Sequence, residues 1–285
     1  MTTTLGLVFD FDDTLAPDST TLLLEEYGVD TEQFWSERFL PRVECGYDPT
    51  VASLTSLLEL VRSEETAEVG QITIDDIESV GRRLDEELFA GLPSFFDEIN
   101  DIVAEYDGIT VEHYVVTEGL EQIVQGTTVA EHCEAVYGSR LATDGDGVVT
   151  EIERPISFTD KTRYLFEINK GIAPNESREN PYAVNDSVSS RERHIPFENL
   201  VYVGNGVTDV PCFSLVTERN GRAFGVAREG DRSPKRRVLD QIGAPRRAGS
   251  LSRPAFDAES RLGSLLRLTV EGLCTDRTLD EREAL

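Results

Sequence analysis

The stretch Leu5–Leu15 reads Leu-Gly-Leu-Val-Phe-Asp-Phe-Asp-Asp-Thr-Leu, a short apolar run that ends in closely spaced acids. A run of this kind is typical of a strand that is buried on both faces, as in a parallel sheet. In open parallel sheets the chemistry collects at the carboxyl ends of the strands. Asp10 and Asp12 lie where this strand ends, so they are the first candidates for functional residues.

Beyond this strand the apolar residues adopt the three- and four-residue spacing of helices. The pattern covers four segments, which are residues 19–27, 31–43, 50–65 and 74–89. Glycine-containing or polar stretches separate the segments, and no strand pattern lies between them. The sequence therefore predicts a helical unit inserted after the first strand.

From residue 92 onward, strand and helix patterns alternate. The predicted strands are residues 109–117, 135–141, 148–152, 200–204 and 223–226, and the predicted helices are 93–106, 120–125, 159–169, 210–218 and 235–242. Such alternation predicts an α/β fold with a doubly wound parallel sheet. Thr159 is the expected N-cap of its helix, and residues 171–193 read as a polar loop.

The chain of 285 residues is long enough for two domains, or for one domain with a large insertion. We predict a catalytic core formed by residues 1–16 and 92–244, and a helical cap formed by residues 17–91. A linker and a C-terminal helix are expected in residues 245–285. The amphipathic pattern of residues 256–272 fits docking on the core as well as pairing with another subunit, so the oligomeric state stays open.

Charge excludes several classes of partner. The chain has 54 Asp plus Glu against 27 Lys plus Arg, a net charge of -27. We expect no nucleic acid or anionic membrane as partner, because both require a basic face. A start without a basic segment or cleavage site predicts a cytoplasmic protein. So few lysines beside so many acids are typical of proteins from a salt-rich cytoplasm, although an ordinary acidic protein is the alternative.

Further polar residues lie at the other predicted strand ends. Thr117 ends one strand, Lys161 begins a helix, and Asn205 and Asp209 follow the strand 200–204. Taken singly, these residues fit a helix cap, a surface charge and an Asn-Gly turn. Together with the two acids of the first strand they fit phosphate chemistry, with a nucleophile, a proton donor, two phosphate-binding groups and a metal site.

The motifs resemble those of the haloacid dehalogenase-like (HAD) hydrolase superfamily. Val8–Leu15 resembles its first motif, Val115–Thr117 its second, Lys161 its third and Val203–Asp209 its fourth. Residues 161–171 and 201–215 are most similar to the phosphoserine-phosphatase-like branch, which carries its cap where the helical segments lie here. The resemblance implies a Rossmann-like core with an inserted α-helical cap.

The resemblance also implies roles for the residues. Asp10 would attack phosphorus, and Asp12 would protonate the leaving oxygen and then activate water. Thr117 and Lys161 would bind the phosphoryl oxygens, and Thr14 would shape the loop. Mg²⁺ would be held by Asp10, the backbone carbonyl of Asp12, Asn205 and Asp209. An acid at Asp12 favours phosphoryl transfer over dehalogenation, because a halide leaves without a proton.

Asn205 departs from the pattern, since this branch usually has Asp there, and Asn removes one negative charge from the metal site. The leading interpretation is a magnesium-dependent phosphatase of a small phosphorylated metabolite. A phosphometabolite-binding relative without turnover, and a phosphomutase or phosphotransferase, remain alternatives. The cations of the cap either meet a substrate carboxylate or balance surface acids; they are Arg38, Arg42, Arg62, Arg82 and Arg83.

Overall fold

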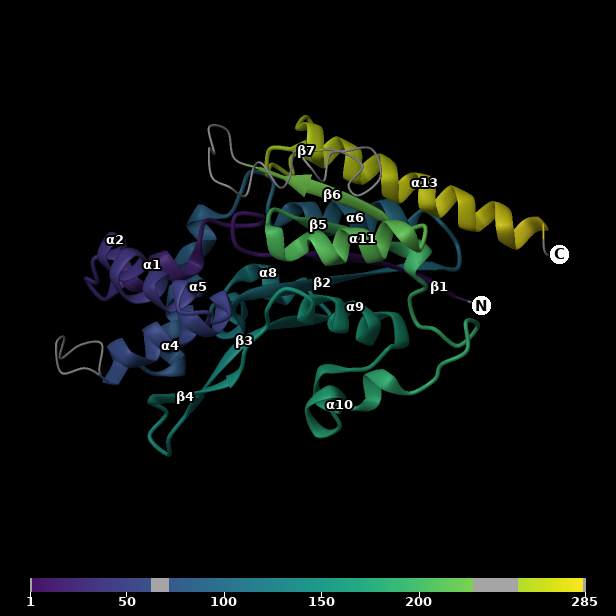
Figure 1. The fold of residues 1–285 in the computed structure, drawn as a ribbon. Coiled ribbons are helices and arrows are strands. Elements are labelled where there is room, and N and C mark those ends of the chain that lie inside the picture. The colour runs from purple at the N-terminus through teal and green to yellow at the C-terminus, as the bar shows by residue number, and fades with distance from the viewer. Residues whose placement is uncertain (1, 63–71, 228–250, 284–285) are drawn as a thin grey trace.

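The computed structural model describes residues 2–62, 72–227 and 251–283, so the predicted helix 235–242 and most of the predicted linker 245–254 lie outside the described residues. At its centre is a seven-stranded sheet of order β4-β3-β2-β1-β5-β6-β7 (Figure 1). The strands are β1 (Thr3–Phe9), β2 (Ile109–Leu120), β3 (Ala135–Thr143), β4 (Val149–Arg154), β5 (Leu200–Gly204), β6 (Arg222–Val226) and β7 (Leu251–Ser252). Neighbouring strands are parallel except β4, which is antiparallel to β3. The predicted fold class is confirmed.

Strand β1 is buried on both faces of the sheet. Leu7 and Phe9 belong to a core with helices α6 (Ser94–Ala104) and α13 (Arg261–Glu283), whereas Val8 belongs to a core with α9 (Asp160–Lys170) and α11 (Val210–Glu218). Successive side chains of a strand point to opposite faces, and here both faces are apolar. Such a strand suits the interior of a sheet, and β1 lies between β2 and β5, which places its carboxyl end and Asp10 in the middle of the sheet.

The helical segments between β1 and α6 gather at one end of the molecule (Figure 1). They are α1 (Ser19–Glu26), α2 (Thr31–Gln33), a π-helical turn (Phe34–Phe39), α3 (Leu40–Glu44), α4 (Pro49–Arg62), α5 (Ile74–Leu84) and a 3₁₀ turn (Asp85–Glu87). The predicted helix 31–43 is thus one helical run whose middle widens to π geometry. The residue limits of cap and core remain a prediction.

Two glycines set the approach of α5 to the core helix α7 (Glu121–Gln125). A Cβ atom added to Gly81 would lie 2.0 Å from the carbonyl oxygen of Ile123, and one added to Gly126 would lie 2.0 Å from that of Glu78. Only glycine fits such contacts, because any side chain would overlap the facing backbone. The inserted helices are therefore seated directly on a core helix.

The C-terminal helix docks on the core, one of the two arrangements that its apolar pattern allows. It begins at Arg261, later than the predicted residue 256, and continues to Glu283. Arg267 on this helix forms an ion pair with Glu98 of α6, and its guanidinium lies 5.1 Å from the centroid of the Phe95 ring. The apolar pattern of residues 256–272 is the face that packs on α6.

Other expectations need correction. Thr159 occupies the N-cap position of α9, but its side chain makes no capping hydrogen bond. Strand β2 continues past Thr117 to Leu120. The predicted loop 171–193 contains a short helix, α10 (Pro174–Glu179), and a 3₁₀ turn, Ala183–Asn185. The Nζ atom of Lys170 holds this segment by donating to the carbonyl oxygens of Val184 and Asp186, each at 2.6 Å.

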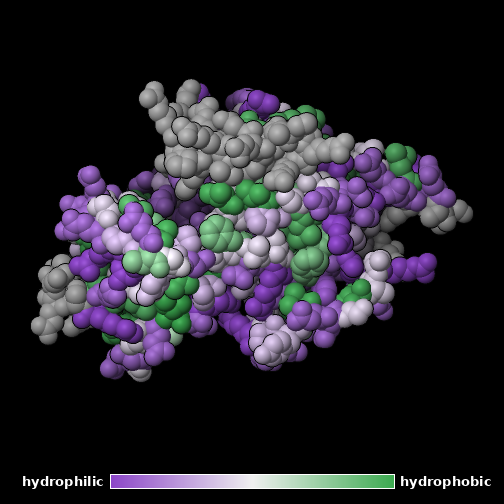
Figure 2. All heavy atoms as spheres, in the orientation of Figure 1, coloured by the Kyte–Doolittle hydropathy of each residue, from purple (hydrophilic) through white to green (hydrophobic). Residues whose placement is uncertain are grey.

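The surface in Figure 2 is dominated by hydrophilic residues, as the acidic composition predicts. Within the described ranges, no helix is long and apolar enough to cross a membrane. All four cysteines are free thiols.

Candidate active site

The carboxyl ends of β1, β2 and β5 and the first turn of α9 meet at one edge of the sheet. All six predicted site residues lie there, and each is buried or half-buried. They are Asp10, Asp12, Thr117, Lys161, Asn205 and Asp209. Parallel strands bring their carboxyl ends to one edge, so residues 195 positions apart along the chain, such as Asp10 and Asn205, become neighbours.

Lys161 is the central cation of this edge. Its Nζ atom lies 2.8 Å from Oδ1 of Asp10 and 2.8 Å from Oδ1 of Asp209, and its side chain is fully buried. Burial disfavours the charge on Lys161, but the carboxylates of Asp10 and Asp209 outweigh it and raise the pKa of Lys161 well above its ordinary value. The ammonium group therefore stays charged.

Asp209 organises the neighbouring groups. Its Oδ1 accepts from Lys161 and, at 2.6 Å, from the hydroxyl of Tyr202. Its Oδ2 accepts from the backbone N–H groups of Asn205 at 3.0 Å and Gly206 at 2.8 Å. Burial and the Asp209 carboxylate raise the pKa of Tyr202 well above its ordinary value, so the phenol stays a donor. Asp209 thus fixes both Lys161 and the loop that carries Asn205.

Each carboxylate oxygen of Asp10 accepts one hydrogen bond. Oδ1 accepts from Nζ of Lys161, and Oδ2 accepts from the hydroxyl of Thr14 at 3.2 Å. Burial and the Asp209 carboxylate raise the pKa of Asp10, and Lys161 opposes this shift. Thr14 is therefore a contact of the acid itself, in addition to being part of the loop.

Asp12 lies in a different environment, without a cation beside it. Its Oδ1 accepts from the backbone N–H of Ser19 at 2.7 Å. Burial, followed by the charge of Asp18, raises the pKa of Asp12 to about 7. A Cβ atom added to Gly119 would lie 2.2 Å from Oδ2 of Asp12, so glycine at this position leaves the carboxyl group its space. Thr117 accepts from the N–H of Gly119 at 3.0 Å, which places its hydroxyl beside the same loop.

Asn205 contacts the oxygen that the resemblance assigns to the metal. Its Nδ2 atom donates to the backbone carbonyl of Asp12, and an amide turned by half a rotation would present Oδ1 there instead. Asp10, the Asp12 carbonyl and Asn205 would then offer three hard oxygen atoms, which suit Mg²⁺. In the part of the chain that the structure describes, no three His, Cys, Asp or Glu side chains group as a metal site, in keeping with a donor set that uses a carbonyl and an amide.

A cavity of 440 Å³ opens beside these residues. Asp10, Asp12 and Asn205 line it from the core, and α1, the π-helical turn and α4 line it from the insertion. Its size lies within the range of small-molecule sites. The inserted helices therefore cover the catalytic edge and leave space for a small substrate.

Sequence reasoning missed several residues of this site. Glu118 lines the cavity, and its place directly after Thr117 was the available signal. The contact of Tyr202 with Asp209 depends on which face of β5 the ring occupies, and the continuous apolar pattern of that strand does not reveal it. The hydrogen bonds donated by the backbone N–H groups of Ser19, Asn205 and Gly206 could not be predicted, because every residue except proline has such a group.

Solved structures show the same fold. A phosphoserine phosphatase carrying an analogue of the phospho-aspartyl intermediate is 18% identical, with a TM-score of 0.55 over 93% of this chain and 99% of that chain. A HAD family hydrolase from Salmonella enterica is 16% identical, with a TM-score of 0.54. The match covers 84% of this chain and 66% of the hydrolase chain.

Among curated proteins, an uncharacterized protein of Borreliella burgdorferi is 26% identical over 234 residues, which cover 74% of this chain and 78% of that protein. The family model of the haloacid dehalogenase-like hydrolases matches residues 7–214, a span that includes all four motifs. With the motifs brought together at one edge of a mostly parallel sheet, the chain belongs to the haloacid dehalogenase-like hydrolase family.

Proposed function

We propose that this protein is a magnesium-dependent phosphatase that hydrolyses a small phosphorylated metabolite through an aspartyl-phosphate. The observation that carries the proposal is the pairing of two unlike carboxyl groups at one cavity. Asp10 is bound to the Lys161 ammonium, and Asp12 has a pKa of about 7. Burial raises the pKa of both acids, but of the two only Asp10 has an ammonium group bound to it that stabilises its ionised form. A pair of acids in such different surroundings suits a nucleophile beside a proton donor.

In the first step, the Asp10 carboxylate attacks phosphorus and the bond between phosphorus and the leaving oxygen breaks. Asp12 gives its proton to that oxygen, so the alcohol departs neutral. In the second step, Asp12 takes a proton from water, which attacks phosphorus and releases phosphate from Asp10. A pKa of about 7 suits both directions of proton transfer near neutral pH.

Lys161 and Thr117 have donors left for the phosphoryl oxygens. The ammonium group has three N–H donors, of which Asp10 and Asp209 take two. The Thr117 hydroxyl accepts from Gly119, so its own O–H remains available. Charge-assisted bonds to the transferring group stabilise the transition state.

Magnesium would be held by Asp10, the Asp12 carbonyl and Asn205, and when bound it offsets the repulsion between the Asp10 carboxylate and the phosphate. Both oxygens of Asp209 are already occupied by four donors. We therefore assign Asp209 a positioning role, in which it orients Lys161 and the Asn205 loop.

The first prediction concerns turnover. The protein should release phosphate from p-nitrophenyl phosphate in molar KCl, with a rate that rises with added Mg²⁺. Asp10→Asn removes the nucleophile and should lower kcat at least about a thousandfold. Asp107→Asn, an exposed residue outside the cavity, is the matched control and should keep the rate. Turnover that survives in Asp10→Asn contradicts the mechanism, and absence of turnover at every Mg²⁺ concentration favours the binding relative.

The second prediction concerns Asn205. Asn205→Asp restores one negative charge beside the Asp12 carbonyl, so half-saturating Mg²⁺ should fall about tenfold. Without metal, the same variant should melt at a lower temperature, because it loses the N–H that donates to Asp12 and gains a charge among acids. Added Mg²⁺ should reverse that loss. Asn220→Asp, in an exposed turn, serves as control, and a Mg²⁺ dependence that Asn205→Asp leaves unchanged argues against Asn205 as a ligand.

The third prediction concerns the pKa of Asp12, which is raised from 3.8 to about 7. Between these values the folded protein binds more protons than the unfolded chain, so its free energy of unfolding falls as pH rises, by up to about 1.4 kcal/mol per pH unit. In Asp12→Asn this contribution is absent. Urea unfolding of metal-free protein between pH 5 and 8 should therefore show a shallower decline in the variant. Parallel declines in the two proteins would show that the pKa of Asp12 is not raised.

A further inference from the structure

The cavity beside the catalytic acids has an aromatic wall supplied by the insertion. Trp35 and Phe39 both line it, with ring centroids 5.2 Å apart and ring planes at 83°. The indole N–H of Trp35 donates to the Thr21 hydroxyl at 3.3 Å, which fixes the orientation of the ring. Phe158 adds an exposed ring to the lining and has a positive φ of 22°, a strained conformation for a non-glycine residue.

The lining of the cavity is acidic beyond Asp10 and Asp12. Glu118 and Asp18 also line the cavity. The Oε2 atom of Glu118 is buried and has no hydrogen-bond partner among the described residues. A buried carboxylate oxygen without a partner is costly, and a ligand that brings a positive charge to it removes that cost.

No lysine or arginine is among the described residues that line this cavity. Three arginines of the insertion have their partners elsewhere: Arg42 pairs with Glu59, Arg83 pairs with Glu26, and Arg62 donates to the carbonyl of Thr150. None of the three lines the cavity.

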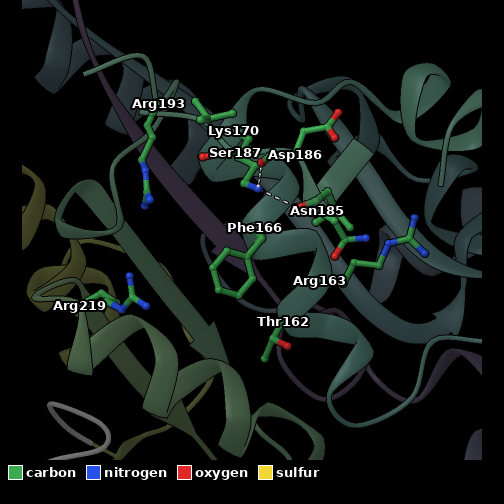
Figure 3. Close-up of a pocket in the computed structure, with 11 residues that line it drawn as sticks. Thr162, Arg163, Phe166, Lys170, Asn185, Asp186, Ser187, Arg193 and Arg219 are labelled. Carbon is green, nitrogen blue, oxygen red and sulfur yellow. Dashed lines mark hydrogen bonds between the residues drawn. The ribbon is translucent and has the colours of Figure 1, made fainter. Parts of the chain in front are cut away.

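Cations gather instead around a separate hollow beside α9. Figure 3 shows Arg163, Lys170, Arg193 and Arg219 around Phe166, in a pocket of 620 Å³ that shares no lining residue with the catalytic cavity. Among the described residues, the lining of the catalytic cavity thus offers no cation to an anionic organic group. A substrate carboxylate there would face Glu118 and Asp18.

We propose that the substrate is a phosphate monoester of an alcohol that bears an ammonium group and no carboxylate, with the ammonium between Glu118 and the rings of Trp35 and Phe39. This inference rests on the phosphatase function proposed above and names its substrate class. Alkylammonium groups are attracted to the faces of aromatic rings and to carboxylates, and both features line this one cavity.

The test compares kcat/KM for three probes under saturating Mg²⁺. Phosphocholine carries the ammonium group, 3,3-dimethylbutyl phosphate has the same shape without the charge, and O-phosphoserine adds a carboxylate. We expect phosphocholine to exceed the neutral isostere about tenfold and phosphoserine by more. Hydrolysis of p-nitrophenyl phosphate without a preference for phosphocholine overturns the substrate class alone. If p-nitrophenyl phosphate is not hydrolysed either, the proposed function itself fails.

Two variants test the residues. Glu118→Gln should abolish the preference for phosphocholine over the neutral isostere, and Trp35→Leu should lower it about threefold. Glu44→Gln, an exposed acid of the insertion outside the cavity, should keep the preference. Mg²⁺ binding is followed in parallel by thermal melting. If Glu118→Gln weakens Mg²⁺ binding and keeps the preference, Glu118 serves the metal and the proposal is wrong.

Discussion

A single buried ammonium group, shared by two carboxylates, organises this protein. The Nζ atom of Lys161 lies 2.8 Å from both Asp10 and Asp209, with all three side chains buried. Taking such charges out of water is costly, and hydrogen bonds to the remaining lone pairs of the carboxylates offset part of that cost. Tyr202, Thr14 and the N–H groups that bind Asp209 supply those bonds. The result is a nucleophile, a phosphate-binding cation and a metal loop whose positions depend on one another.

The sheet makes this network possible because it gathers residues distant in sequence. Strand β1 is apolar on both faces and lies between β2 and β5, which fixes Asp10 next to the end of β2 that carries Thr117 and the loop that carries Asn205. Asp12 lies outside the network, and no cation of the described residues is bound to it. The two acids, only two positions apart, therefore differ in that Asp10 alone contacts Lys161 of α9.

The sequence allowed the fold and the site residues to be predicted because both depend on local patterns. The apolar run of Leu5–Phe9 and the alternation after residue 92 require no tertiary information, and polar residues at strand ends mark the site. The contact of Tyr202 with Asp209, the missing cap bond of Thr159 and the partner of the C-terminal helix depend on how elements pack. Residue types do not reveal such packing.

Residues of the core and residues of the insertion line different parts of the proposed substrate site. In the proposed function the core supplies the phosphate chemistry, and the aromatic residues of the π-helical turn, which line the same cavity, would contact the rest of the substrate. The net charge of -27 opposes the binding of an anionic substrate, because such a substrate must approach an acidic surface. The buried Lys161 and a bound metal are then the local charges that hold the phosphate against the overall field.

The central claim is that the Asp10 carboxylate held by Lys161 is the nucleophile. Its most direct test is mass spectrometry of protein quenched during turnover of p-nitrophenyl phosphate, with peptides mapped for a covalent phosphoryl group. We predict one phosphoryl group on Asp10 in the wild-type protein and none in Asp10→Asn. Phosphate release with no phosphoryl group on Asp10 at any time, or with the group on another residue, would contradict the mechanism.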